Sequence, residues 1–180
     1  MMSFKLANID SIIDLMRIYV VSEKPEFIEL VHGWTREYGL HTMTCNPVKE
    51  DSRLILPVDA KVIYYESEDS NSLIGRMVFS NWNPRNFSMQ FSFIVDPDFV
   101  TWDVSSRMVD HAISNFFGKR VDVKKLYCLI PEYNDHAVHC LKSLGFRLDG
   151  TLRDHHELKG KLYGERIYSV MRSEWSAELR

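Results

Sequence analysis

The spacing of hydrophobic residues divides the chain into segments of helical and of alternating period. Apolar residues recur every three or four positions over residues 11–21, and again from Pro25 to the residue before Gly39. This spacing places them on one face of a helix. Residues 39–60 mix Gly, Pro, Asn and Asp with one short apolar run and predict a long loop. We therefore expect two amphipathic helices that cover a sheet, followed by a loop.

A β pattern begins after this loop. Three runs rich in β-branched and aromatic residues, at 61–67, 73–82 and 87–95, are separated by polar turns and predict a three-stranded meander. The remaining predicted elements are a helix over 103–118, a strand over 126–130, a helix over 134–144, and strands over 146–157 and 162–173 joined by a turn at Lys159-Gly160-Lys161. The order predicts a mixed α/β chain with a largely antiparallel sheet and one crossover helix between strands.

Composition excludes several classes of protein. The chain has 180 residues, and 22 Lys and Arg against 25 Asp and Glu give a formal charge of −3, which argues against a nucleic-acid partner. Its three cysteines, Cys45, Cys128 and Cys140, have no spacing typical of a disulfide scaffold or zinc site. We find no signal peptide and no run of about 18 apolar residues that could span a membrane. We therefore expect one domain over residues 1–180, located in the cytoplasm, without a membrane partner.

The second half of the chain carries short motifs in a characteristic order. Leu73-Ile74-Gly75-Arg76 begins a predicted strand, and the later motifs are Pro131-Glu132, Asn134, Leu144-Gly145-Phe146, Gly150, Arg153, Tyr168, Glu174 and Trp175. From about residue 60 to 175 this order resembles the GNAT superfamily of N-acetyltransferases. Within that family the chain is nearest to the branch that acetylates ribosomal-protein N-termini and related small amines.

The resemblance implies a fold, a cofactor and a substrate class. It implies a mixed, mostly antiparallel sheet of about six to seven strands flanked by about four helices. The strands at 88–95 and 125–130 would splay apart to hold acetyl-CoA. The acceptor would be a primary amine: a protein N-terminus, a lysine or a small amine. The implied cofactor-binding residues are Phe93 and Val95 along the pantetheine, the helix start at Asp103, Val104, Ser105, Ser106 and Arg107 around the pyrophosphate, and Asn134 on the later helix.

The corner between the strand at 88–95 and the helix over 103–118, where the family binds the pyrophosphate of acetyl-CoA, departs from the family pattern. Both of its glycines are missing, and the first glycine position falls on Asp103. We expect Asp103 to be the helix N-cap and to occupy the backbone amides that a pyrophosphate needs. The ring of Trp102 would fill space that the cofactor uses. The sequence therefore predicts weak or absent acetyl-CoA binding and leaves a second function open: a non-catalytic GNAT-fold binding or structural module, in a larger assembly.

The catalytic groups common in the family are also replaced. The frequent strand glutamate falls on Gln90, and the frequent tyrosine of the later helix falls on Leu141. Candidates to replace them are Glu132 and Tyr133, just past the strand at 126–130, and His139, favoured as a base because imidazole titrates near neutral pH. His155-His156 does not predict a metal site, since successive strand residues point to opposite faces. Whether a protein partner or a second copy of the chain is needed stays open.

Overall fold

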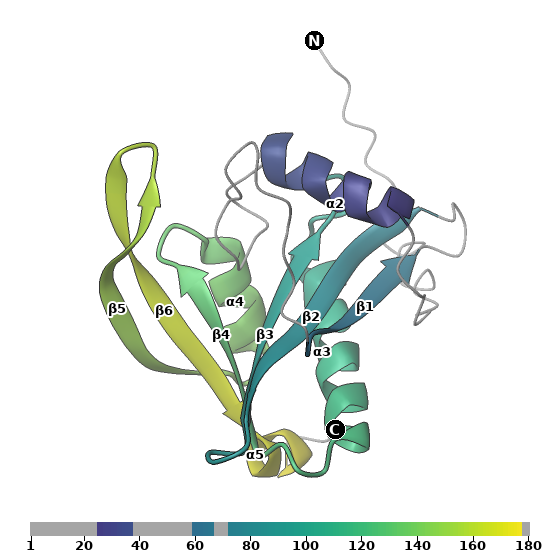
Figure 1. The fold of residues 1–180 in the computed structure, drawn as a ribbon, viewed down its shortest axis with the longest axis vertical. Coiled ribbons are helices and arrows are strands. Elements are labelled where there is room, and N and C mark those ends of the chain that lie inside the picture. The colour runs from purple at the N-terminus through teal and green to yellow at the C-terminus, as the bar shows by residue number, and fades with distance from the viewer. Residues whose placement is uncertain (1–24, 38–58, 67–71, 178–180) are drawn as a thin grey trace.

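Six strands form one sheet with helices on both of its faces (Figure 1). The computed structural model describes residues 25–37, 59–66 and 72–177. The strand order is β1-β2-β3-β4-β6-β5, and every neighbouring pair is antiparallel except β3 and β4. The predicted mixed, mostly antiparallel sheet is confirmed. Helix α2 lies over one face of the sheet, and α3 and α4 lie over the other.

The element bounds agree closely with the pattern of hydrophobic residues. The helices are α2 (Pro25–Glu37), α3 (Trp102–Lys119), α4 (Asp135–Ser143) and α5 (Arg172–Ala177), and the strands are β1 (Lys61–Glu66), β2 (Leu73–Asn83), β3 (Ser88–Val95), β4 (Lys125–Pro131), β5 (Arg147–Leu158) and β6 (Lys161–Met171). The predicted helix over 11–21 and most of the predicted loop over 39–60 lie outside the described residues. The last strand ends at Met171 rather than at residue 173, because α5 begins at Arg172.

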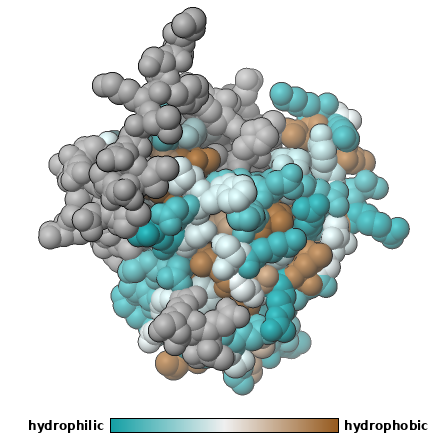
Figure 2. Space-filling view, turned by 180° about the vertical axis from the view of Figure 1, so that it is seen from behind, coloured by the Kyte–Doolittle hydropathy of each residue, from teal (hydrophilic) through white to brown (hydrophobic). Residues whose placement is uncertain are grey.

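Alternation along β3 separates the hydrophobic core into two clusters. Phe91, Phe93 and Val95 belong to the large cluster that α3 and α4 cover, whereas Ile94 belongs to the smaller cluster under α2. Alternate residues of a strand point to opposite faces, so one strand serves both clusters. The face covered by α3 and α4 shows hydrophobic residues in small groups among hydrophilic ones (Figure 2). No helix in the described ranges has a stretch long and apolar enough to cross a membrane.

The hairpin between β5 and β6 confirms the predicted turn. Leu158 pairs with Lys161, and the two residues between them, Lys159 and Gly160, have φ angles of 51° and 79°. Two positive φ values in a two-residue loop are typical of a type I′ turn, whose twist matches that of the flanking strands. Glycine adopts this conformation without a steric penalty.

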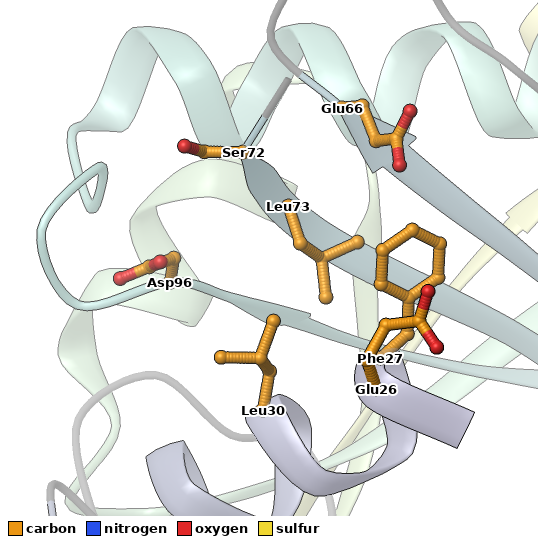
Figure 3. Close-up of a pocket in the computed structure, with 7 residues that line it drawn as sticks. All are labelled: Glu26, Phe27, Leu30, Glu66, Ser72, Leu73 and Asp96. Atoms are coloured by element: carbon orange, nitrogen blue, oxygen red, sulfur yellow. The ribbon is translucent and has the colours of Figure 1, made fainter. Parts of the chain in front are cut away.

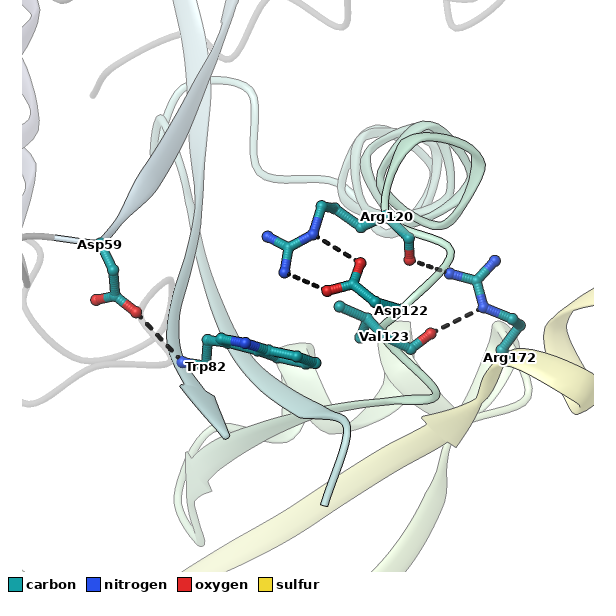
Figure 4. A network of polar contacts seen from close by, with 6 residues as sticks. All are labelled: Asp59, Trp82, Arg120, Asp122, Val123 and Arg172. Atoms are coloured by element: carbon teal, nitrogen blue, oxygen red, sulfur yellow. Dashed lines mark hydrogen bonds and ion pairs between the residues drawn. The ribbon is translucent and has the colours of Figure 1, made fainter. Parts of the chain in front are cut away.

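The carboxyl end of α3 is held by a side chain from the C-terminal part of the chain (Figure 4). The guanidinium group of Arg172 donates hydrogen bonds to the carbonyl oxygens of Phe117, at 2.7 Å, and of Val123, at 2.8 Å, and a short one to that of Arg120. Beside it, Arg120 forms a two-pronged ion pair with Asp122. A cation at this position also interacts favourably with the negative end of the helix dipole. Arg172 thus joins α5 to α3.

Candidate active site

The two parallel strands at the centre of the sheet separate from each other. They pair over Ser88–Lys125, Met89–Leu126 and Gln90–Tyr127 only. Beyond these pairs β3 continues to Val95 and β4 to Pro131 with no further pairing between them, and the two strands diverge (Figure 1). The predicted splay between β3 and β4 is therefore confirmed, and its open end lies where the two strands end.

The register of β3 with β2 determines which backbone groups of β3 face the splay. The amide of Asp96 donates to the carbonyl of Ile74 at 2.7 Å, and the antiparallel register runs unbroken from Val95 back to Gln90. Backbone groups of an antiparallel strand point alternately to its two sides. The peptide groups of Phe91, Phe93 and Val95 therefore point away from β2, into the splay. Two of these residues, Phe93 and Val95, are those predicted to bind the pantetheine.

The first turn of α3 lies at the open end of the splay, because residues 96–101 connect β3 directly to this helix. The N-cap is Thr101, whose Oγ1 accepts a hydrogen bond from the amide of Val104 at 3.2 Å. The prediction of Asp103 as N-cap is wrong: the helix begins earlier, and Asp103 lies inside its first turn. The amides of Trp102 and Asp103 have no acceptor within the helix, since the first amides of any helix lack one. They lie at the positive end of the helix dipole.

The charge of Asp103 is balanced by a neighbour on the same helix. Its carboxylate lies 3.0 Å from Nε of Arg107, one turn later, and its side chain is 54% exposed. An exposed pair of this kind contributes little to stability. It does hold the carboxylate beside a cation and away from the amides of the first turn. The carboxylate of Asp103 therefore does not occupy the amides of Trp102 and Asp103, which are the ones without an acceptor in the helix.

Side chains from the N-terminal half of α3 contact α4 along its length. Ser105 Oγ lies 2.9 Å from Nε2 of His136, and the hydroxyl of Ser106 lies 3.3 Å from that of Ser143. The third contact is a ring stack between Trp102 and His139, with centroids 3.6 Å apart. The amide of Ser105 donates to the carbonyl of Thr101 at 3.1 Å. Of the predicted pyrophosphate ligands, the amides of Val104, Ser105, Ser106 and Arg107 are therefore already bonded at the start of α3, and only that of Asp103 lacks an acceptor in the helix.

Comparison with models of known protein families identifies the family of this chain. A family model described as "Acetyltransferase (GNAT) domain" matches residues 27–167. The chain belongs to the GNAT acetyltransferase family. Comparison with curated protein sequences finds no match.

Solved GNAT structures share the fold at low sequence identity. The spermidine N-acetyltransferase from Vibrio cholerae in complex with CoA and spermine superposes with a TM-score of 0.74, at 15% identity, over 89% of this chain and 98% of that chain. The spermidine/spermine N-acetyltransferase from the same organism in complex with manganese ions has a TM-score of 0.72 and 16% identity, over 93% and 98% of the two chains. These similarities establish the GNAT fold over nearly the whole chain.

Glu132, a predicted catalytic residue of this GNAT domain, is fixed to β6. Its amide donates to the carbonyl of Gly164 at 2.9 Å, and its Oε2 accepts from the amide of Gly164, also at 2.9 Å. A Cβ atom at residue 164 would lie 2.5 Å from Cδ of Glu132, so any other residue there would displace the carboxylate from this position. These contacts give Glu132 a structural role at the end of β4.

Tyr133, the next predicted residue, is hydrogen-bonded to a histidine that the sequence did not single out as its partner. Its hydroxyl lies 2.7 Å from Nε2 of His156, and its ring packs edge-on against Tyr163 with centroids 4.9 Å apart. His156 is 3% exposed, and burial lowers its pKa. The imidazole is therefore neutral at pH 7, and its Nε2 either accepts a hydrogen bond from the phenol or donates one to it, depending on the tautomer.

The remaining predicted residues lie on α4. Asn134 is fully buried and caps this helix, because its Oδ1 accepts from the amide of Ala137 at 3.0 Å. His139 is exposed and stacks on Trp102. His136 is half-buried, and burial, followed by the neighbouring His139, lowers its pKa. The structure therefore brings His139 to the start of α3 and Tyr133 to the hairpin, rather than collecting them in one cluster.

A cavity with an acidic rim lies on the opposite face of the sheet, under α2 (Figure 3). It has a volume of about 670 Å³, with Phe27, Leu30 and Leu73 on its apolar side. Its acidic lining residues are Glu26, Glu66 and Asp96. Burial raises the pKa of the Asp96 carboxyl. A neighbouring cavity of about 760 Å³ shares Glu26, Leu30 and Asp96 and adds Glu29 and Asp98.

The two adjacent histidines of β5 have different surroundings. A shift in register between Leu152 and His156 leaves His155 about half exposed, with Nε2 at 3.4 Å from Oε2 of Glu165, while His156 is buried. Burial raises the pKa of Glu165. Within the part of the chain that the structure describes, no three His, Cys, Asp or Glu side chains are grouped so that they could hold a metal ion.

Proposed function

We propose that this protein transfers the acetyl group of acetyl-CoA to a primary amine. The observation that carries the proposal is the open splay between β3 and β4, with the first turn of α3 at its open end. A non-catalytic module would be favoured by Trp102 or Asp103 inserted between the strands. Both side chains are instead more than half exposed, with Trp102 against α4 and Asp103 against Arg107.

The residues around the splay fit acetyl-CoA in three respects. The peptide groups of Phe93 and Val95 point into the splay, where an extended pantetheine chain can lie alongside them. The amides of Trp102 and Asp103, at the positive end of the dipole of α3, are suited to bind a pyrophosphate. The charge of Asp103 is balanced by Arg107, so the corner is less repulsive to phosphate than its sequence indicates.

We assign Tyr133 as the proton donor to the leaving thiolate. Bound acetyl-CoA would supply an activated thioester. The amine nitrogen would form the new bond to the acetyl carbon as the C–S bond breaks, releasing one proton to solvent, and the thiolate would take its proton from Tyr133, which regains one from solvent. When His156 carries its proton on Nε2, the imidazole donates to the phenol oxygen at 2.7 Å, and the phenol can donate its own hydrogen to the thiolate. Tyr133 lies two residues beyond Pro131, where β4 ends at the open side of the splay.

The acidic cavities under α2 support a cationic amine as acceptor. They adjoin Asp96, which directly follows the last residue of β3 and is therefore near the open end of the splay. Carboxylates near an apolar wall attract an alkylammonium group and accommodate its hydrocarbon chain. The two Vibrio cholerae neighbours are named for spermidine or spermine, which are amines of this type. Among the predicted acceptors, these features favour a small amine over a protein N-terminus or lysine.

Calorimetric titration and a transfer assay test the proposal together. We expect acetyl-CoA and CoA to bind with micromolar dissociation constants, and thiol release from acetyl-CoA to depend on an added amine such as spermidine. Tyr133→Phe should lower kcat on the order of a hundredfold while leaving acetyl-CoA binding unchanged. The absence of binding up to about millimolar acetyl-CoA, equivalent to roughly −4 kcal/mol, would contradict the proposal.

A further inference from the structure

Trp102 is a large aromatic side chain placed in solvent at the start of α3. It is 56% exposed, more than any other aromatic residue whose side chain is described, the next being Phe87 at 42%. Tryptophan is usually largely buried, because its ring carries a large apolar area. An exposed indole beside a proposed cofactor site is therefore a feature that a ligand could explain.

The indole is held in place by both helices. One of its neighbours is the His139 ring of α4, with centroids 3.6 Å apart and an angle of 34° between the rings. The hydrogen bond between Ser105 and His136 and the contact of Ser106 with Ser143 fix α4 against α3. A ring that is already ordered loses little conformational freedom when a ligand packs on it.

We propose that Trp102, backed by His139, is an aromatic platform for the adenine base of acyl-CoA. The inference rests on the proposed function, which places the pyrophosphate at the amides of Trp102 and Asp103. Adenine is joined to that pyrophosphate through a single ribose, so the base can reach only groups near the first turn of α3. Trp102 supplies both one of these amides and a solvent-exposed ring, and base–aromatic stacking is a common mode of nucleotide binding.

The platform also explains how the corner can bind cofactor without the family's glycines. Glycines let a phosphate approach the backbone closely, and this chain has Asp103 and Ser105 at the two glycine positions. Stacking of one base is worth about 5-fold to 150-fold in affinity, which is about 1–3 kcal/mol at 1.4 kcal/mol per factor of ten. This gain is large enough to offset a looser fit of the pyrophosphate.

The test compares donors with and without the nucleotide. Wild type, Trp102→Ala, Trp102→Phe and His139→Ala are titrated with acetyl-CoA and with an adenosine bisphosphate, the nucleotide half of CoA. Acetyl transfer is then measured with acetyl-CoA and with S-acetylpantetheine, which lacks the nucleotide. Phe87→Ala, an exposed aromatic at the turn between β2 and β3, is the matched control. Circular dichroism and thermal unfolding confirm that each variant is folded.

We expect Trp102→Ala to weaken both nucleotide-containing ligands about 10-fold to 100-fold, and to lower kcat/KM for acetyl-CoA by a far larger factor than kcat/KM for S-acetylpantetheine. Trp102→Phe should keep most of the affinity, and His139→Ala should lose part of it. If wild type and Trp102→Ala bind acetyl-CoA equally, or if Trp102→Ala impairs both donors equally, the platform is wrong while the proposed function stands. If wild type binds neither ligand and transfers no acetyl group, the platform and the proposed function both fail.

Discussion

Replacement of Arg172 by alanine should destabilise the protein more than any surface substitution of similar size. The guanidinium group satisfies three backbone carbonyls at the end of α3, those of Phe117, Arg120 and Val123, and lies over the Phe117 ring at 4.6 Å. A hydrogen bond to a charged group contributes about 1.5–3 kcal/mol, but water replaces part of it because the side chain is only half-buried. We therefore expect a loss of about 2–4 kcal/mol in the free energy of unfolding.

Urea unfolding measures this loss, and two further variants separate its causes. Arg172→Lys keeps the charge but not the planar fork that reaches three acceptors, so it should recover only part of the stability. Arg147→Ala is the matched control, because Arg147 of β5 makes an exposed ion pair with Glu174 of α5. Its removal should cost under about 1 kcal/mol in the free energy of unfolding. For a chain of this length, the loss in Arg172→Ala corresponds to a fall of roughly 5–15 °C in Tm. An Arg172→Ala variant as stable as Arg147→Ala would refute the conclusion that Arg172 holds the carboxyl end of α3.

Three further predictions concern the site and its supports. Gly164→Ala should lower the free energy of unfolding by about 1–3 kcal/mol, because the new Cβ overlaps the Glu132 carboxylate. Adding Glu132→Ala should restore part of this loss, as measured by urea unfolding. A double variant less stable than Gly164→Ala would count against this contact. Asp103→Asn should tighten acetyl-CoA binding roughly threefold to tenfold in titration calorimetry, since it removes a carboxylate beside the phosphates and releases Arg107 from its ion pair. Weaker binding would place the pyrophosphate elsewhere. Burial lowers the pKa of His111, His136 and His156, so below about pH 6.5 the unfolded chain takes up protons that the folded protein does not. The free energy of unfolding, measured by urea titration, should therefore fall as pH drops from 7 to 5.5. Burial raises the pKa values of Asp96 and Glu165, and these two groups oppose the fall at lower pH. A urea midpoint that rises from pH 7 to 5.5 would be inconsistent with the burial of these histidines.

The order and position of the elements could be predicted because each depends on local spacing. The buried alternation of β3, the apolar face of α3 and the turn at Lys159-Gly160 are all visible in a few consecutive residues. The splay was implied by family resemblance rather than by any pattern within β3 or β4. Its presence in the structure reflects the short register of three residue pairs.

The details of the site depended on contacts between distant segments. Thr101 and Asp103 are both good N-cap residues, and local preference could not choose between them. The pairing of Tyr133 with His156 depends on an irregular register near Asp154, whose φ of 48° no regular strand pattern predicts. Likewise, α5 begins where Arg172 meets α3, a contact that joins residues about fifty positions apart.

The short register between β3 and β4 makes the sheet two half-sheets joined by a narrow seam. One half contains β1, β2 and β3, and the other contains β4, β6 and β5, with only three residue pairs connecting them. A ligand lying in the splay would contact both halves and act as a bridge across the seam. Such a ligand should raise the unfolding temperature steadily with its concentration, since it binds the folded form alone. It should also slow hydrogen exchange at the amide of Val95, and so couple the motions of the two halves.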